Sequence, residues 1–489
     1  MRMRRVRVHS MAEEAGVSIA TMSCACWQPS RVRESTRLKV SEASKRLNDM
    51  LSASVRNLAR GRPAPPSGKY EQTGSSGGSP AGSAHQIEQG RYIHMPTPTY
   101  TFPQDFLWGA ATAAHQIEGN NVNADWWERE HRPDSDLSEP SGDADDSYNR
   151  YAEDISLLAG SGLNTYRFSV EWARVEPEEG FFSQAQLLHY RAMIEACLQD
   201  GVTPMVTLNH MTLPRWLARR GGWRDPASTD LFGRYVEHLI PILEGVTWVC
   251  TINEPNMVAL TQGGQEGNDM AAASLPTPDP VISESLVKAH RKARAVLSLL
   301  PGIKSGWTIA CQDFQALPGC EQDMEEYRYP REDFFTQAAR GDDFIGVQAY
   351  LRTFIGHDGP RPVPEDVEKT LTGWEYYPDA LGESVRHTWR IAEHTPIVVT
   401  ENGIATADDS RRVDYAFDAL AGLHQAMDEG VRVEGYLHWS LLDNYEWGSY
   451  KPTFGLVSVD RETFERHPRP SLAWLGQVAR SGILAHPRG

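Results

Sequence analysis

A stretch in the last fifth of the chain reads Ile397-Val398-Val399-Thr400-Glu401-Asn402-Gly403. Its three β-branched aliphatic residues and the following threonine are typical of a short strand that is buried on both faces. The run leads directly into a carboxylate, an amide and a glycine. A charge at the mouth of an apolar strand is costly unless it is used there, and in a barrel of parallel strands the active site lies at this carboxyl end.

A second run of β-forming residues ends in the same way. Val246-Thr247-Trp248-Val249-Cys250-Thr251 leads into Ile252-Asn253-Glu254-Pro255. A single Glu-Asn-Gly is interpreted more readily as a cap for the following turn, but two strands that each end in a glutamate favour a shared site. Two facing carboxylates suit glycoside hydrolysis, in which a protonated carboxyl group donates to the leaving oxygen and an ionised one attacks the anomeric carbon.

The residues around both glutamates resemble those of a known enzyme family. Thr251-Ile252-Asn253-Glu254-Pro255 and Val399-Thr400-Glu401-Asn402-Gly403 are similar to the acid/base and nucleophile motifs of glycoside hydrolase family 1, the β-glucosidase family. The resemblance covers about residues 100–480. It implies a retaining β-glycosidase, in the first instance a β-glucosidase acting on small β-glucosides, with Glu254 as general acid and base and Glu401 as nucleophile.

Further family motifs lie near the ends of the expected strands. They include Gln116-Ile117-Glu118-Gly119, Tyr166-Arg167-Phe168-Ser169 and the run from Trp439 to Trp447. The resemblance implies that Arg167 keeps the nucleophile ionised, because a nearby cation lowers the pKa of a carboxyl group. The substrate-binding residues that it implies are Gln116, His210, Asn253, Gln348, Tyr350, Trp439, Glu446 and Trp447. Of these, Asn253 is expected to bind the sugar's 2-hydroxyl, and an anionic Glu446 beside the 6-position predicts a preference for unphosphorylated sugars.

Three segments depart from the pattern of the family. Met211-Thr212 stands where the family has Trp-Asp, and Gln348-Ala349-Tyr350 stands where it has Asn-Tyr-Tyr. Asn256 replaces an aromatic residue in the segment that shapes the aglycone side. The preferred glycone (glucose, galactose or fucose) and the aglycone therefore stay open. A thioglucosidase is disfavoured by the presence of Glu254, because thiolate leaving groups need little help from an acid.

From Thr101 onwards, strand-like and helix-like segments alternate. The expected strands begin near Phe106, Thr165, Pro204, Thr247, Ile303, Asp343, Ile397 and Val433. Helical stretches such as 187–198 and 229–243 lie between them. Eight alternations predict an α/β fold, a TIM (β/α)8 barrel, over residues 99–489.

The beginning of the chain differs in composition from the rest. Residues 1–62 carry 13 Lys and Arg against 5 Asp and Glu, whereas the remainder carries 35 against 60 and the whole chain has a net charge of −17. Residues 63–98 are rich in Pro, Gly and Ser, which predicts a disordered linker. We therefore expect a small all-α segment at 1–62, a linker at 63–98 and the barrel at 99–489.

The basic segment also resembles a known module. Its three expected helices and the stretch from Ala15 to Ser23 are similar to the helix-turn-helix headpiece of the LacI repressor family. Cys24 stands at a usually basic recognition position, Met50-Leu51-Ser52 replaces the start of the hinge, and no dimerisation domain of that family follows. We interpret residues 1–62 as a remnant without DNA binding. A sugar-responsive DNA-binding regulator with a ligand-sensing barrel is the alternative hypothesis.

The remaining expectations concern location and cofactors. Six scattered cysteines indicate reduced thiols in a cytoplasmic protein, and Cys24 and Cys26 are not expected to bind zinc. No apolar run of the length needed for a signal peptide or a membrane span occurs. No zinc, calcium or phosphate-loop pattern is present, so we expect no cofactor and no metal. The sequence does not indicate the oligomeric state.

Overall fold

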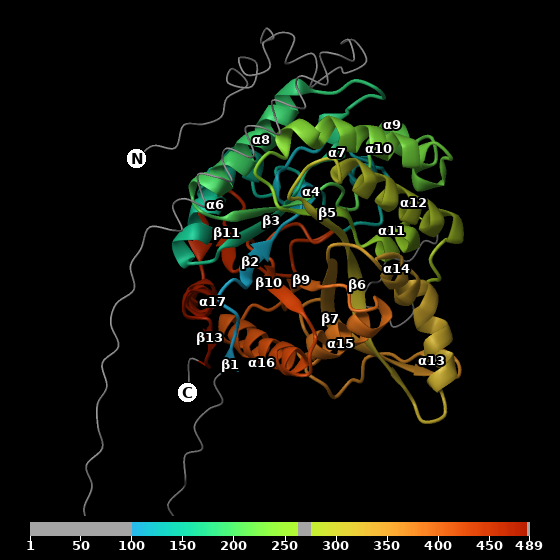
Figure 1. Cartoon of the computed structure of the whole chain (residues 1–489), viewed down its shortest axis with the longest axis vertical. Helices are drawn as coiled ribbons and strands as arrows, with labels where there is room; N and C mark the ends of the chain where they lie inside the picture. The colour runs from blue at the N-terminus through green and yellow to red at the C-terminus, as the bar shows by residue number, and fades with distance from the viewer. Residues whose placement is uncertain (1–99, 263–274, 487–489) are drawn as a thin grey trace, which may run out of the picture. The chain divides into compact units, whose positions relative to one another are not determined.

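The computed structural model describes residues 100–262 and 275–486, and its central feature is a closed barrel of eight parallel strands (Figure 1). The order around the barrel is β6-β5-β4-β3-β2-β10-β9-β7, and β6 also pairs with β7, which closes the ring. The strands are β2 (Leu107–Ala111), β3 (Thr165–Ser169), β4 (Thr203–Thr207), β5 (Trp248–Asn253), β6 (Lys304–Ala316), β7 (Ile345–Gly356), β9 (Ile397–Asn402) and β10 (Val433–Trp439). The predicted (β/α)8 barrel is confirmed, with a strand near each of the eight expected starts.

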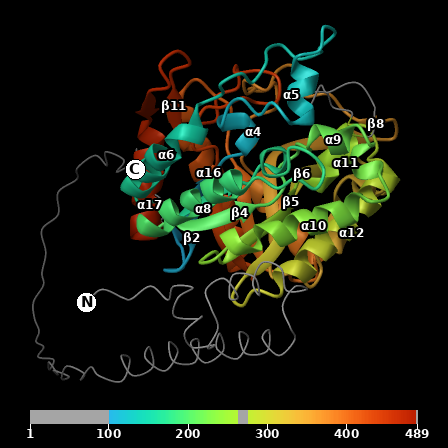
Figure 2. The same cartoon turned by 90° about the horizontal axis from the view of Figure 1, so that it is seen from above.

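Helices cover the outside of the barrel (Figures 1 and 2). The longer ones are α6 (Ser147–Ser161), α8 (Gln184–Gln199), α10 (Ser228–Leu239), α12 (Pro280–Leu297), α15 (Ala380–Ile391), α16 (Asp409–Asp428) and α17 (Pro470–Ser481). Capping side chains mark the starts of two of them: Ser183 accepts from the Gln186 N–H at the start of α8, and Asp279 accepts from two N–H groups at the start of α12. α10 shows the expected amphipathic pattern, because its buried apolar residues recur every three or four positions.

Shorter elements connect these layers. The short helices are α4 (Ala114–Ile117), α5 (Asp125–Glu130), α7 (Trp172–Val175), α9 (Arg215–Ala218), α11 (Pro255–Thr261), α13 (Glu321–Arg328) and α14 (Phe334–Ala338), with 3₁₀ turns at Gly222–Arg224 and Ile240–Ile242 and a π-helical turn at Tyr329–Asp333. The short strands are β1 (Tyr100–Thr101), β8 (Gly359–Pro360), β11 (Val457–Val459), β12 (Arg466–Pro468) and β13 (Ile483–Leu484).

Two apolar clusters form most of the core. A large apolar layer lies between the strands and the surrounding helices. A smaller cluster consists of side chains from the barrel strands and their edges, and the partly buried Leu107 packs against it. Its members are Met205, Trp248, Cys250, Phe344, Val398 and Leu437. The amino-terminal end of the barrel is therefore a packed core, which leaves the carboxyl ends of the strands as the place for a cavity.

Two sequence predictions fall on residues that the structure does not describe. The helix-turn-helix resemblance at 1–62 and the linker at 63–98 both lie outside the described residues, as do Cys24 and Cys26. Within residues 100–262 and 275–486, no helix is long and apolar enough to cross a membrane.

Candidate active site

The carboxyl ends of the barrel strands enclose a cavity of about 100 Å³. Nine of the residues predicted from the sequence line it: Gln116, His210, Glu254, Gln348, Tyr350, Glu401, Trp439, Glu446 and Trp447. The other two, Arg167 and Asn253, are fully buried beside this lining and are hydrogen-bonded to each other. Residues that are up to 331 positions apart in the sequence are thus gathered at one end of the barrel.

The Glu401 carboxylate has a donor on each oxygen. Arg167 Nη1 donates to Oε1 at 2.5 Å, and Tyr350 Oη donates to Oε2 at 2.8 Å. Thr207 fixes the guanidinium in turn, since its Oγ1 accepts from Arg167 Nε at 3.0 Å. Burial raises the pKa of Glu401, and the charge of Arg167 together with the bonds from Arg167 and Tyr350 opposes that rise. These two donors stabilise the ionised form of Glu401. A nearby carboxyl group without such donors is less easily ionised.

Glu254 has the opposite surroundings. No donor among the described residues binds its carboxyl group, although its backbone N–H is held by Thr308 O at 2.8 Å. Burial raises the pKa of Glu254 well above its usual range, and the nearby charge of Glu401 raises it further, against an opposing effect of Arg167. Two glutamates in one cavity thus have different tendencies to hold a proton, which is the arrangement that acid and nucleophile roles require.

The backbone around the cavity is strained at several points. Glu254, Met211 and Trp447 have φ values of 43°, 70° and 51°, in the left-handed region that residues with a side chain rarely adopt. Such residues cost free energy and cluster at functional sites. Gly403 meets a different constraint, because a Cβ atom there would lie 2.1 Å from the Trp439 carbonyl oxygen. The glycine that follows Glu401-Asn402 is therefore required by the close approach of the loop after β9 to β10.

The amide of Asn253 is held at its oxygen and free at its nitrogen. Its Oδ1 accepts from Gln348 Nε2 at 2.9 Å, from Thr308 Oγ1 at 3.0 Å and from Arg167 Nη2. Its buried Nδ2 has no partner among the described residues. Three donors on the oxygen fix which way the amide points, so the unpaired N–H₂ group is available to a ligand.

Three more buried polar atoms in the cavity lack a partner among residues 100–262 and 275–486: Gln116 Oε1, His210 Nδ1 and Gln348 Oε1. Gln116 is oriented through its nitrogen, which donates to Asn444 Oδ1 at 2.9 Å and to the Tyr445 carbonyl at 3.0 Å. Burial lowers the pKa of His210 well below its usual value, and Arg167 lowers it further, so the ring is neutral. Buried polar groups are nearly always paired, so this set predicts a ligand with several hydroxyl groups.

Aromatic rings and a third glutamate complete the cavity. His210 stacks on Trp439 and Trp447 with ring centroids 6.0 and 6.2 Å apart. Trp439 Nε1 donates to Glu446 Oε1 at 3.0 Å. Burial raises the pKa of Glu446 to about 8, a rise that the bond from Trp439 opposes. The sequence predicts an anionic Glu446 at neutral pH, whereas burial outweighs the donor and favours the protonated form.

Several members of the site were not predicted from the sequence. Thr308 holds the amide of Asn253, and Asn444 holds that of Gln116. Trp374 and Phe454 add two aromatic side chains to the lining of the cavity, and the Trp374 ring centroid lies 5.6 Å from that of Tyr350. Asn444 lies inside the run from Trp439 to Trp447 and could have been predicted from the sequence. Trp374 follows no strand, so no pattern in the sequence indicated it.

Two groups of described residues have the composition of a metal site. They are Cys320, Asp323 and His357, and Glu332, Asp333 and His387. None of these six residues lines the cavity. The expectation that the active site works without a metal stays a prediction.

A (β/α)8 barrel with two unequal glutamates and unpaired amides at its carboxyl end is the site of a glycoside hydrolase. Comparison with known proteins agrees. The family model described as Glycosyl hydrolase family 1 matches residues 98–269 and 343–482, and the chain belongs to this family.

Relatives of similar length support the assignment. Beta-glucosidase A of Acetivibrio thermocellus is 32% identical over 444 residues, which cover 78% of this chain and 98% of the relative. Beta-glucosidase A of Thermotoga maritima is 30% identical over 448 residues, with coverage of 78% and 98%.

Solved structures show the same fold. The crystal structure of the β-glycosidase BGL167 matches with a TM-score of 0.72 at 44% identity, covering 78% of this chain and 97% of that one. The Thermotoga maritima β-glucosidase in complex with glucoimidazole matches with a TM-score of 0.72 at 28% identity, covering 78% and 99%.

Proposed function

We propose that the chain is a retaining β-glucosidase that hydrolyses terminal β-glucosyl residues of small β-glucosides by double displacement. The observation that carries the proposal is the pair of buried glutamates in one cavity, of which only Glu401 is held by donors. The relatives support the substrate class, since both curated relatives described above are named beta-glucosidases. Hydrolysis of a panel of nitrophenyl β-glycosides, including the galactoside and the fucoside, tests the proposal and ranks the glycones.

Each glutamate acts in both steps of the reaction. In the first step Glu254, protonated because of its raised pKa, donates its proton to the glycosidic oxygen while Glu401 attacks the anomeric carbon. The aglycone leaves, and a covalent glycosyl ester forms on Glu401. Esterification removes the negative charge that raised the pKa of Glu254, so Glu254 releases its proton more readily. In the second step the Glu254 carboxylate takes a proton from water, which displaces the sugar from Glu401.

The remaining residues bind and orient the sugar. Asn253 Nδ2 is the free donor for the 2-hydroxyl, a contact that strengthens in the transition state. The unpaired acceptors and donors of Gln116, Gln348 and His210 suit other hydroxyl groups. Glu446 and Trp447 are assigned to the 4- and 6-hydroxyls and Trp439 to the sugar face. Arg167 and Tyr350 support the nucleophile rather than the sugar.

The rival hypotheses are weaker on the same observations. A barrel that only senses sugar has no use for a carboxyl group whose pKa is raised beside a second one that has a donor on each oxygen. A thioglucosidase has no need of Glu254 as an acid. Four cysteines of the described residues, Cys197, Cys250, Cys311 and Cys320, are free. Free thiols support a reducing compartment, and we propose the cytoplasm.

Hydrolysis is expected to retain the anomeric configuration. Glu401 attacks from the face opposite the aglycone, and water then displaces it from the face that the aglycone left, so two inversions give net retention. Proton NMR of the first products from an aryl β-glucoside should show β-glucose before mutarotation produces the α-anomer. Initial formation of α-glucose would show that Glu401 is not the nucleophile.

Plain β-glucosides are expected to react faster than their 6-phosphates, and the difference is expected to widen as the pH rises past about 8. That is where Glu446, whose pKa burial raises to about 8, becomes anionic. Repulsion between charges about 4 Å apart is worth about 1–4 kcal/mol, depending on screening. The measurement is the ratio of kcat/KM for the two substrates on both sides of that pH. A constant ratio would mean that Glu446 does not face the 6-position, and faster hydrolysis of the phosphate would refute the preference itself.

Deletion of residues 1–95 is expected to leave kcat/KM for an aryl β-glucoside unchanged. We propose residues 99–489 as the catalytic domain, because every residue assigned to the site lies between Gln116 and Trp447. We also propose that residues 1–62 do not bind DNA specifically, since a remainder carrying 35 basic against 60 acidic residues repels a polyanion. A mobility shift that identifies a palindromic site, released by a β-glucoside, would instead support the regulator hypothesis.

A further inference from the structure

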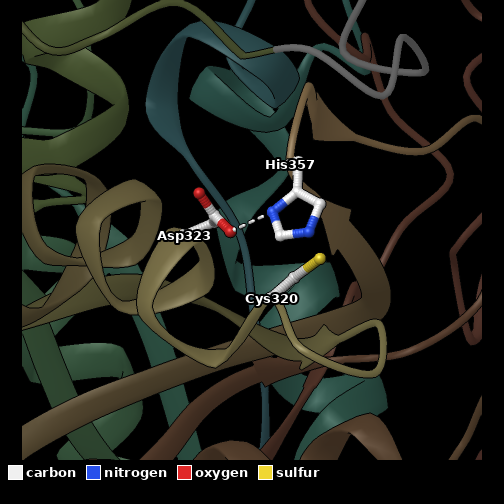
Figure 3. Close-up of side chains that lie close together, drawn as sticks. All are labelled: Cys320, Asp323 and His357. Carbon is white, nitrogen blue, oxygen red and sulfur yellow. Dashed lines mark hydrogen bonds and ion pairs between the residues drawn. The ribbon is translucent and has the colours of Figure 1, made fainter.

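Three side chains with metal-binding chemistry converge outside the active site. Figure 3 shows Cys320, Asp323 and His357, with the Cys320 sulfur pointing toward the imidazole ring. Asp323 Oδ2 accepts from His357 Nδ1 at 2.8 Å. One ligand atom from each of the three residues lies within 4.8 Å of the others. We call these three residues the Cys320 cluster.

Two tight turns bring the Cys320 cluster together. The turn Leu317–Cys320 is closed by the Cys320 N–H donating to the Leu317 carbonyl at 2.9 Å, and Gly319 supplies the φ of 85° that its third position requires. Cys320 is then the N-cap of α13, and Asp323 follows three residues later, on the same face of the helix. His357 lies in the two-residue turn that joins β7 to β8. The donors are therefore presented by two well-defined backbone segments.

The donor set matches one class of ion. Thiolate, imidazole and carboxylate are the three ligand types of protein-bound Zn²⁺, and a soft thiolate disfavours Mg²⁺ and Ca²⁺. Three protein ligands leave one position of a tetrahedral ion for water. The first turn of α13 carries two acidic residues, Glu321 and Asp323, so the local field attracts a cation. The Cys320 thiol is free in the described part of the chain, so a disulfide does not occupy it.

The geometry needs only a small adjustment to accept the ion. Bonds of about 2.0–2.3 Å to zinc place the ligand atoms roughly 3–4 Å apart, so the cluster has to contract by about 1 Å. The His357 side chain is 71% exposed and the Asp323 side chain 38%, so both can move and can be reached from solvent. The hydrogen bond between them is exposed, so breaking it in water costs little.

The second group with metal-ligand composition is a poorer candidate. Glu332, Asp333 and His387 are all buried, and His387 Nε2 is bonded to Asp333 Oδ1 at 2.6 Å while Arg328 pairs with the other oxygen at 3.3 Å. An ion there would have to break a buried pair, which is strongly destabilising. It would also lack a thiolate.

We propose that Cys320, Asp323 and His357 bind Zn²⁺ and so join the start of α13 to the β7–β8 turn. Binding exchanges the thiol proton for the ion, which is bound by the thiolate, a carboxylate oxygen and one imidazole nitrogen. Cys320 and Asp323 lie between residues 269 and 343, the part of the barrel that the family model does not match, whereas His357 lies inside the matched range. The sequence alone does not indicate this site, because His357 is 34 residues from Asp323 and shares no motif with it.

Cobalt provides a direct test on the full-length protein. After treatment with a chelator and a reductant, titration with Co²⁺ is expected to produce a near-ultraviolet thiolate-to-cobalt charge-transfer band and visible bands of tetrahedral geometry. The bands should saturate at one ion per chain and disappear when Zn²⁺ is added. Zn²⁺ alone should raise Tm in proportion to its occupancy, since an ion that binds only the folded state stabilises it.

Variants assign the signal to its ligands. Cys320→Ser should lose the charge-transfer band, and His357→Gln and Asp323→Asn should weaken binding at least about tenfold. Asp358→Asn, which changes the neighbour of His357 in the same turn, is the matched control and should titrate like the wild type. A Cys24→Ser/Cys26→Ser double variant should keep the band, which separates this site from those two cysteines.

The outcomes that overturn the proposal are equally specific. Absence of the charge-transfer band in the wild type, or its persistence in Cys320→Ser, would rule out the Cys320 cluster as a zinc site. Hydrolysis of an aryl β-glucoside by the same variants in chelator is expected to match the wild type, because none of the three residues lines the catalytic cavity. Failure of the zinc site therefore leaves the proposed glycosidase function untouched, and the reverse also holds.

Discussion

Replacing Glu401 by alanine is expected to lower kcat for every β-glucoside by more than about 10⁴-fold, as loss of a catalytic nucleophile does in other enzymes. No other group can take its place, because the Glu254 carboxyl group is needed as the acid and the phenol of Tyr350 has a pKa raised by burial and by Glu401. The steady-state rate with a nitrophenyl β-glucoside, compared with that of the wild type, measures the loss.

Two further measurements separate chemistry from folding. The far-ultraviolet circular dichroism of Glu401→Ala should match the wild type, since Arg167 keeps its bonds to Thr207 and Asn253. Glu176→Ala is the matched control, because Glu176 is a buried glutamate paired with Arg234 outside the cavity. It is expected to lower Tm and to leave kcat near the wild-type value.

A small anion tests the direction of attack in Glu401→Ala. Azide can enter the space left by the carboxylate and attack an activated glucoside from the same face as Glu401 did. Without a second displacement the product should be the α-glucosyl azide. Appearance of the β-azide, or undiminished hydrolysis without azide, would remove Glu401 from the role of nucleophile.

The barrel could be predicted closely from the sequence because each of its strands is a short β-rich run between helical segments. β9 is buried at all six positions, and β5 likewise, which is why continuous β-branched and apolar runs marked them. The outer halves of β6 and β7 could not be predicted. There the two strands continue as a pair from Asp313↔Arg352 to Ala316↔Ile355, and half-buried polar residues interrupt the apolar run.

The site was predicted by residue type, and its electrostatics were not. Motif spacing placed Glu254 and Glu401 at strand ends and Arg167 within a strand. A motif does not tell whether the oxygen or the nitrogen of the Asn253 and Gln116 amides is already bonded. Burial also determines the protonation state of Glu446, which the sequence did not predict correctly. It raises the pKa of Glu446 to about 8, against the anionic state expected from the sequence, because the cost of desolvation depends on neighbours that are distant in the chain.

Replacing Glu254 by alanine is expected to slow glucosides with poor leaving groups by about 10²–10⁴-fold, the usual contribution of a general acid. Substrates with activated leaving groups, such as a dinitrophenyl β-glucoside, need no proton in the first step and should lose far less in that step. The measurement is the dependence of kcat/KM on the pKa of the leaving phenol, which should be steeper in Glu254→Ala. Glu254→Gln, which keeps the shape of the side chain, should behave alike.

The second step gives the same residue an independent signature. Without Glu254 as base the glycosyl ester on Glu401 should accumulate, so activated substrates should show a burst followed by slow turnover and a low KM. Azide needs no base and should restore turnover, with the β-glucosyl azide as product because two displacements still occur.

The pH profile should change in a direction that follows from the raised pKa of Glu254. In the wild type, kcat/KM falls as the pH rises and Glu254 loses the proton that it must donate, and it falls at low pH when Glu401 is protonated. Glu254→Ala with an activated substrate should keep the acidic limb and lose the basic one. An unchanged basic limb, or equal losses for activated and unactivated substrates, would show that another residue is the acid. The raised pKa of Glu254 would then have no role in protonating the leaving group.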